Sequence, residues 1–138
     1  MRTVEFGRTG TQVSALALGC MSLSREKLEA SKATVRRAYE LGITFFDTAD
    51  VYGRGESESI LGEALREASI PRDQIFVATK CGIVFQGMNP DYAYKAYDLS
   101  AGYIKATCEA SLQRLGMDYV DLYQPHRIDY LTHPEETA

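Results

Sequence analysis

Several features that mark common classes of protein are missing from this sequence of 138 residues. No apolar run reaches the roughly 18 residues that a membrane-spanning helix requires. No basic run is present, and the net charge of −4 with a pI near 5.2 argues against binding to nucleic acid or an anionic membrane. The first residues lead into mixed polar sequence rather than the apolar core of a signal peptide. We therefore expect a cytoplasmic protein with no nucleic-acid or membrane partner.

Cysteine is also scarce, and its spacing excludes two kinds of structural site. Cys20, Cys81 and Cys108 are odd in number, lack C-x-x-C spacing and have no histidine cluster nearby. Neither a disulfide framework nor a metal site is expected from this pattern, so free thiols are the favoured interpretation. A redox-sensing role for Cys20 and Cys81 is a weaker alternative, because Lys80 is their only apparent basic partner.

The glycine-rich motifs of nucleotide-binding sheets are absent as well. The sequence has neither G-x-G-x-x-G after its first strand nor G-x-x-x-x-G-K-[ST] anywhere. Hydrophobic residues make up 45% of the chain and charged residues 25%, with no low-complexity tract and no repeat, which is typical of an ordered globular domain. One domain with a real core is expected.

The apolar patterns that are present alternate between strand and helix. Strand-like segments, each ending in polar or small residues, are 13–18, 43–46, 75–79 and 119–123. Helical patterns run from Ser24 to Gly42, onward from Ser57, and from Ser100 to Gly116. This order calls for right-handed crossovers and a parallel sheet, as in a (β/α) barrel or an open doubly wound sheet.

Two further segments stand outside this alternation. Residues 3–6 and 11–13 form a hairpin pattern around a glycine turn. Residues 83–99 form a long loop that contains three tyrosines and a turn signal, namely Tyr92, Tyr94, Tyr97 and Asn89-Pro90-Asp91. These aromatic residues either line a substrate mouth or pack on the surface, and loops of this length are often functional.

Chemically useful side chains follow successive predicted strands. Asp47, Lys80 and His126 each stand just past a different strand, and Tyr52 stands in the loop after Asp47. In a barrel these positions converge on one rim. Lys80 would favour the phenolate of Tyr52 while Asp47 holds the ammonium, and His126 could donate a hydrogen bond to a carbonyl oxygen. Tyr52 could then act as the general acid in reduction of a carbonyl.

With these residues in place, the sequence resembles the aldo-keto reductase superfamily over its whole length. The segments that carry the resemblance, in the family's order and spacing, are F-D-T-A-D-V-Y-G (46–53), G-E-S-E-S-I-L-G (55–62), I-F-V-A-T-K (75–80), S-L-Q-R-L-G-M-D-Y-V-D-L-Y (111–123) and H-R-I-D (126–129). K-C-G-I (80–83) and H-R-I-D-Y-L (126–131) look most like the bacterial-type, YdhF-like branch.

The resemblance implies an α/β fold of the TIM type, a (β/α)8 barrel closed at its base by an N-terminal hairpin. It implies NADPH-dependent reduction of an aldehyde or ketone, with Asp47, Tyr52, Lys80 and His126 as the catalytic tetrad. It also implies that Gly19, Cys20 and Met21 join Asp47 on the nicotinamide side of the pocket. From the residues alone, Gly19 either allows close approach of a ligand or simply ends a strand.

A complete barrel has eight strands, and this pattern supplies four. Thr132-His133-Pro134-Glu135 is a capping box near the end of the chain, so residues 1–138 are expected to be the amino-terminal half of a barrel, with about four β/α units, truncated at the start of the fourth helix. Such a half would self-associate through its open sheet edges. Its small-molecule carbonyl substrate is not specified by the sequence, and a catalytically inactive reductase-like or regulatory module is the alternative.

Overall fold

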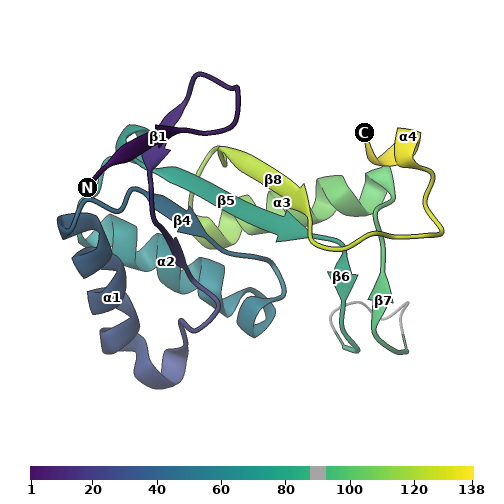
Figure 1. Cartoon of the computed structure of the whole chain (residues 1–138). Helices are drawn as coiled ribbons and strands as arrows, with labels where there is room; N and C mark the ends of the chain where they lie inside the picture. The colour runs from purple at the N-terminus through teal and green to yellow at the C-terminus, as the bar shows by residue number, and fades with distance from the viewer. Residues whose placement is uncertain (88–92) are drawn as a thin grey trace.

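A parallel four-stranded sheet forms the centre of the protein in a computed structural model that describes residues 1–87 and 93–138. Its strands are adjacent in the order β3, β4, β5 and β8, with bounds Ala17–Gly19, Phe45–Asp47, Phe76–Cys81 and Leu122–Pro125. All neighbouring pairs are parallel. The predicted parallel sheet is therefore confirmed (Figure 1).

Three helices connect these strands and pack against one another in sequence order. They are α1 (Leu28–Glu40), α2 (Glu56–Glu67) and α3 (Ala101–Leu115). Short 3-10 turns lie at Arg25–Lys27 (η1), Tyr52–Gly55 (η2) and Arg72–Gln74 (η3), and a last helix, α4, covers Pro134–Thr137. Among the described residues, no helix combines the length and apolar character needed to cross a membrane.

The core lies between the helices and the sheet. The predicted apolar stripe of α2 faces it, with Ile60 and Leu61 fully buried against Phe46 of β4 and Val77 of β5. Burial of side chains of this size contributes about 1.5–3 kcal/mol each, so the crossover helices are held mainly by this contact.

The predicted N-terminal hairpin is confirmed and covers the other side of the sheet. Its strands β1 (Thr3–Glu5) and β2 (Gln12–Ser14) are antiparallel. The ring of Phe6 lies 5.8 Å from that of Phe45 and 4.9 Å from that of Phe76, at the start of the central strands. The carboxyl ends of these strands lie away from the hairpin, and the candidate site is found there.

The segment predicted as a loop over residues 83–99 instead contains a short hairpin. Strands β6 (Ile83–Val84) and β7 (Ala96–Tyr97) pair antiparallel and project from the carboxyl end of the sheet (Figure 1). Strands of two residues are too short to be recognised from the periodicity of hydrophobic residues in the sequence. The predicted turn at residues 89–91 and Tyr92 lie outside the described residues.

Several predicted boundaries were displaced. The last strand begins at Leu122 rather than at residue 119, because its pairing with β5 starts at Leu122, which lies opposite Ala78. Just before this point, the backbone N–H of Asp121 donates to the carbonyl of Val77. The final helix is capped by His133, whose Nδ1 accepts from Glu135 N–H at 3.4 Å, so the predicted capping box at Thr132 was wrong. The hydroxyl of Thr132 donates to Asp129 instead, at 2.6 Å.

Candidate active site

The four residues predicted to form a catalytic group lie together at the carboxyl end of the sheet. Asp47 is the last residue of β4, and Lys80 is the next-to-last residue of β5 rather than a residue after it. His126 follows β8 directly, and its backbone N–H donates to the carbonyl of Cys81 at 2.8 Å. Tyr52 begins η2, the turn between β4 and α2.

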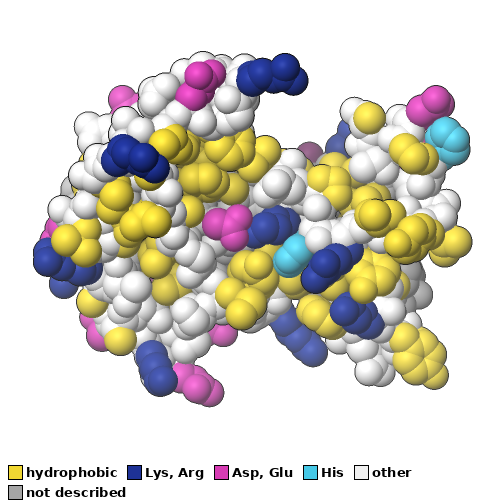
Figure 2. All heavy atoms as spheres, viewed as in Figure 1, with side chains coloured by type: hydrophobic (Ala, Val, Ile, Leu, Met, Phe, Trp, Pro, Cys, Tyr) yellow, Lys and Arg dark blue, Asp and Glu magenta, His cyan; other side chains and the backbone are white. Residues whose placement is uncertain are grey.

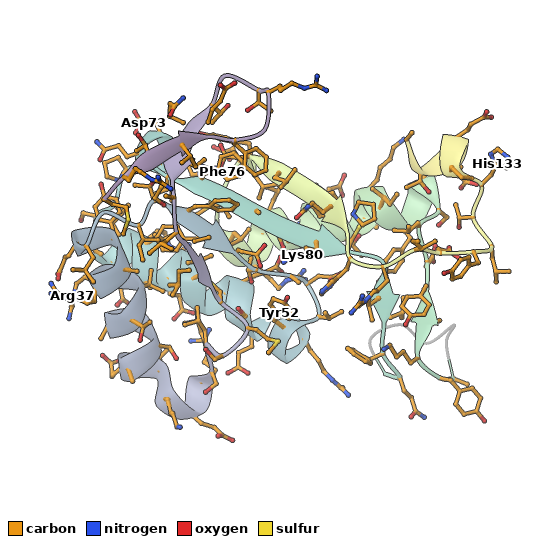
Figure 3. The ribbon with its side chains drawn as sticks, viewed as in Figure 1. Arg37, Tyr52, Asp73, Phe76, Lys80 and His133 are labelled. Carbon is orange, nitrogen blue, oxygen red and sulfur yellow. The ribbon has the colours of Figure 1, made fainter. Side chains whose placement is uncertain are left out.

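Lys80 is the centre of this group. Its Nζ donates to Asp47 Oδ2 and to the carbonyl of Thr48, both at 2.7 Å, and its side chain is only 14% exposed. The same ammonium lies 5.2 Å from the ring centroid of Tyr52, within the range of a cation–π contact. Figure 3 shows Lys80 at the end of its strand with Tyr52 directly beside it. The cation is therefore fixed between a carboxylate and a phenol.

His126 also packs against the ring of Tyr52. The two rings meet edge to face, with centroids 5.6 Å apart and an interplanar angle of 81°. Burial lowers the pKa of His126, and the charges of Lys80 and Arg127 lower it further, while Asp47 opposes them. The imidazole is therefore neutral at pH 7.

The tautomer of His126 follows from burial. Its Nδ1 is buried and has no hydrogen-bond partner among residues 1–87 and 93–138. Because a buried N–H without an acceptor is rarer than an unused acceptor, we assign the proton to Nε2. His126 then presents a neutral N–H donor.

The loop that carries Tyr52 is anchored to the strand that carries Lys80. The N–H of Thr48 bonds the carbonyl of Ala78 at 2.9 Å, and the N–H of Asp50 bonds the carbonyl of Lys80 at 3.1 Å. The chain can turn sharply into α2 because Gly53 and Gly55 have positive φ angles of 58° and 89°, which glycine adopts at little cost. The two backbone hydrogen bonds and the sharp turn together hold Tyr52 next to Lys80.

The residues predicted to contact a nicotinamide ring occupy the neighbouring strand end. Gly19 is in register with Asp47, and a Cβ built on it would meet no atom within 4 Å. Met21 is 69% exposed, whereas the side chain of Cys20 is fully buried in the core. The backbone of Cys20 is also occupied, because its N–H bonds the carbonyl of Asp47 at 2.8 Å and its carbonyl accepts from Ser57 at 2.7 Å. Cys20 therefore offers no exposed surface for the predicted nicotinamide contact, and burial raises the pKa of its thiol to about 12.

The cysteines are free, as expected from the sequence. Burial also raises the pKa of the thiols of Cys81 and Cys108. Cys20 follows β3 and Cys81 ends β5, and strand β4 lies between these two strands. Thiols that resist ionisation react slowly, which disfavours the redox alternative. Within the described part of the chain, no three His, Cys, Asp or Glu residues are placed to hold a metal ion.

A buried ionic cluster beneath the site was not predicted from the sequence. Glu58 of α2 is fully buried, accepts a hydrogen bond from Thr79 at 2.5 Å and pairs with Arg114 Nε at 2.6 Å. Arg114 in turn lies against Gly55, where a Cβ would come within 2.5 Å of its Cδ. The cluster therefore ties α2, β5 and α3 to the turn that carries Tyr52.

Asp50 is a second buried carboxyl group in this region. It is 2% exposed, and neither of its oxygens has a hydrogen-bond partner in the described chain. Burial raises the pKa of Asp50 to about 7, the charge of Glu58 adds to the effect, and Arg114 opposes it. Asp50 is thus partly protonated at neutral pH.

We expect Asp50 to make stability fall as pH rises from about 4 to about 7. In this window the folded chain binds more protons at Asp50 than the unfolded chain, so the free energy of unfolding decreases by up to roughly 4 kcal/mol. Asp50→Asn cannot ionise and should lose this part of the slope. Urea unfolding of both chains across the window measures it, and parallel pH dependences would contradict the prediction.

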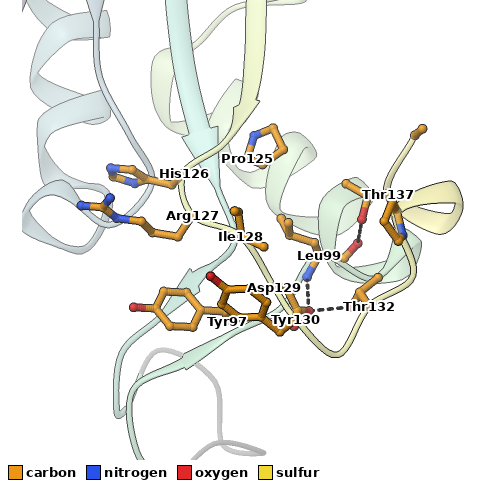
Figure 4. A pocket seen from close by; sticks show the side chains of 12 residues that line it. Tyr97, Leu99, Pro125, His126, Arg127, Ile128, Asp129, Tyr130, Thr132 and Thr137 are labelled. Atoms are coloured by element: carbon orange, nitrogen blue, oxygen red, sulfur yellow. Dashed lines mark hydrogen bonds between the residues drawn. The ribbon is translucent and has the colours of Figure 1, made fainter.

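A cavity of about 860 Å³ lies beside His126 (Figure 4). Its wall, residues 126–132, is held in place by Asp129, which accepts hydrogen bonds from Leu99 N–H at 3.1 Å and from Thr132 at 2.6 Å. Hydrogen bonds from the hydroxyl of Thr132 and from the backbone N–H groups of Leu131, Leu99 and Thr132 hold the pKa of Asp129 below its usual value. These hydrogen bonds therefore hold the segment after β8 in place next to His126.

Comparisons with known proteins agree with this arrangement. Residues 15–138 match the model of the aldo/keto reductase family. The chain is 39% identical over 143 residues to "Probable aldo-keto reductase 1" of Glycine max. Its structure superposes on the holo form of aldo-keto reductase AKR11C1 from Bacillus halodurans with a TM-score of 0.86 and 36% identity.

The chain corresponds to only part of each relative. It is covered completely by the Glycine max match but spans 40% of that protein, and 99% of it aligns with 44% of the Bacillus halodurans chain. The fold is the amino-terminal portion of a (β/α)8 barrel. Assignment to the bacterial-type branch stays a prediction.

Proposed function

Because this chain belongs to the aldo/keto reductase family, we propose that it supplies the catalytic residues for NADPH-dependent reduction of an aldehyde or ketone. One observation supports this most directly. Lys80 contacts Asp47 at 2.7 Å and lies over the ring of Tyr52 at 5.2 Å, while His126 meets the same ring at 5.6 Å. A proton donor, a cation and a neutral hydrogen-bond donor thus lie close together.

In this proposal Tyr52 is the general acid. When a carbonyl carbon gains hydride, its oxygen develops negative charge and must receive a proton. The phenol of Tyr52 transfers that proton to the oxygen and becomes a phenolate, and solvent later returns a proton to it. The ammonium of Lys80 stabilises the phenolate, and Asp47 keeps the ammonium positioned.

His126 has a separate role as a neutral hydrogen-bond donor. Its Nε2–H orients the substrate oxygen toward Tyr52 and stabilises the charge that develops there. A protonated imidazole would place a third positive charge beside Lys80 and Arg127, which is why these cations lower its pKa. Neutral His126 donates a hydrogen bond without that repulsion.

The strand ends fit a flat cofactor ring. The open space above Gly19, beside Asp47 and the exposed Met21, offers a surface on which a nicotinamide could lie. NADPH, when bound, would supply the hydride. Gly19, Met21 and Asp47 are the residues of this chain that we propose to hold its nicotinamide end.

A hybrid enzyme tests the function. Residues 1–138 would replace the matching 40% of the Glycine max relative, and NADPH oxidation would be followed at 340 nm with benzaldehyde, a neutral substrate. We expect turnover that depends on both reactants. A hybrid that folds by circular dichroism and binds NADPH, yet reduces no aldehyde when the unaltered relative does, would instead favour the inactive reductase-like module.

We also expect the isolated chain to self-associate. Strands β3 and β8 are the edges of its sheet, and large apolar side chains near the end of β8 are exposed, including Tyr130 at 87% and Leu131 at 96%. Unpaired edges and apolar patches promote association. Light scattering at micromolar concentrations should show dimers or larger species, and a monodisperse monomer would contradict this expectation.

A further inference from the structure

A groove of about 500 Å³ lies beside the proposed catalytic group. It separates η2 from the β6–β7 hairpin and is lined by Val51, Gly53, Arg54, Phe85, Gln86 and Lys95. Val51 and Gly53 are the chain neighbours of Tyr52. The loops after neighbouring barrel strands form the substrate mouth in this type of fold, so the groove is placed to receive the part of a substrate that extends from its carbonyl.

Two cations line this groove, Arg54 and Lys95. Arg54 has the left-handed conformation, with φ 56° and ψ 45°, and its Nη1 reaches to 3.7 Å from the position of a Cβ built on Gly87 in the opposite hairpin. The ammonium of Lys95 lies 5.5 Å from the ring centroid of Phe85 and 5.6 Å from that of Tyr97. Non-glycine residues rarely adopt the backbone conformation of Arg54.

These cations are not neutralised by the residues around them. Neither Arg54 nor Lys95 forms an ion pair within residues 1–87 and 93–138. The carboxylate of Glu56 lies near Gly53, with Oε2 3.4 Å from the position of a Cβ built there, and its Oε1 accepts a hydrogen bond from the backbone N–H of Arg25. The excess of positive charge is local, because the whole chain has a net charge of −4.

The positive charge continues toward the proposed catalytic group. Arg127 follows His126 and lies close enough to affect its protonation, as does Lys80. The acidic partner at this place, Asp47, is already bonded to Lys80 at 2.7 Å. Figure 2 shows basic side chains gathered around a histidine in the middle of this face. An anionic ligand would therefore be drawn to the groove.

Building on the proposed function, we propose that the carbonyl substrate carries a carboxylate or phosphate group, which Arg54 and Lys95 bind in the groove beside Tyr52. Arg54 would offer a planar pair of N–H donors, which suits the two oxygens of such a group. Lys95 would add a point charge from the hairpin side. The substrate would thus be held by its anionic end while its carbonyl faces Tyr52 and His126.

Equilibrium dialysis of the 138-residue chain tests this with two product-like probes that cannot form a Schiff base with lysine. They are 4-(hydroxymethyl)benzoate and the neutral 4-(hydroxymethyl)benzamide, which has a similar shape. We expect the carboxylate to bind roughly tenfold more tightly, with a preference that shrinks in high salt. Arg54→Met combined with Lys95→Met should abolish the preference. Arg8→Met combined with Lys105→Met removes the same charge from exposed positions elsewhere and should preserve it.

Three results would overturn the proposal. They are equal binding of the two probes, no binding of either, and a preference that survives in the Arg54→Met, Lys95→Met chain. Loss of NADPH binding in that chain, with the probe preference unchanged, would show that the cations serve the cofactor's phosphates instead. Failure of the proposed function is separate, because benzaldehyde reduction by the hybrid enzyme does not depend on an anionic group.

Discussion

In the hybrid enzyme, Tyr52→Phe should reduce aldehyde turnover by roughly 10²- to 10⁴-fold, the usual contribution of a general acid. Phenylalanine keeps the edge-to-face contact with His126 and the ring beneath Lys80. It has no proton to transfer when the substrate oxygen gains charge. The loss should therefore appear in the chemical step, measured as the rate of NADPH oxidation in a single turnover.

Binding of NADPH should remain nearly unchanged in Tyr52→Phe, because the proposed nicotinamide surface is formed at Gly19 and Asp47. Fluorescence titration measures this separately from turnover. Tyr94→Phe is the matched control, since Tyr94 is 81% exposed and lies outside the proposed site. If Tyr52→Phe kept more than about a tenth of the parent's rate, Tyr52 would not be the general acid.

The sheet could be predicted from the sequence because each of its elements has a local signal. The stripe of Ile60 and Leu61 identifies the buried face of α2, and the apolar segment before Asp47 identifies a strand. Polar residues at the carboxyl ends of parallel strands then meet at one rim of the sheet, and this does not depend on the conformation of the loops. Asp47, Lys80 and His126 could therefore be grouped from their positions in the chain.

The ends of the strands could not be predicted in the same way. Strand β5 includes Lys80 and Cys81 because it pairs with β8 as far as Pro125, and pairing between distant segments leaves no local pattern. Lys80 reads as a polar residue that ends a strand, yet its ammonium is satisfied by Asp47 from the neighbouring strand. Tertiary contacts, not propensity, fix this boundary.

The buried ionic cluster escaped prediction for a related reason. Glu58 stands among polar residues at the start of a helix, where a carboxylate is usually solvated and favoured by the helix dipole. Its partner Arg114 is 56 residues away in the chain. Only the packing of α3 against α2 makes the pair, so the sequence alone gives no sign that Glu58 is fully buried.

We expect Arg114→Met to lower the free energy of unfolding by roughly 3–5 kcal/mol, the cost of leaving one member of a buried ion pair without its partner. Glu58 would keep only the hydrogen bond from Thr79, with its second oxygen unpaired in the core. Urea unfolding of the 138-residue chain measures the change. Arg37→Met is the matched control, because its ion pair with Glu40 is exposed and should contribute no more than about 1 kcal/mol.

The two members of the pair should not be equivalent. The side chain of Arg114 is 29% exposed and can turn to water when Glu58 is removed, whereas the carboxylate of Glu58 is fully enclosed. Glu58→Leu should therefore destabilise less than Arg114→Met, and adding Glu58→Leu to Arg114→Met should restore part of the lost stability. Additive losses in the double variant would show that the pair is not coupled, and that the turn carrying Tyr52 is held by other contacts.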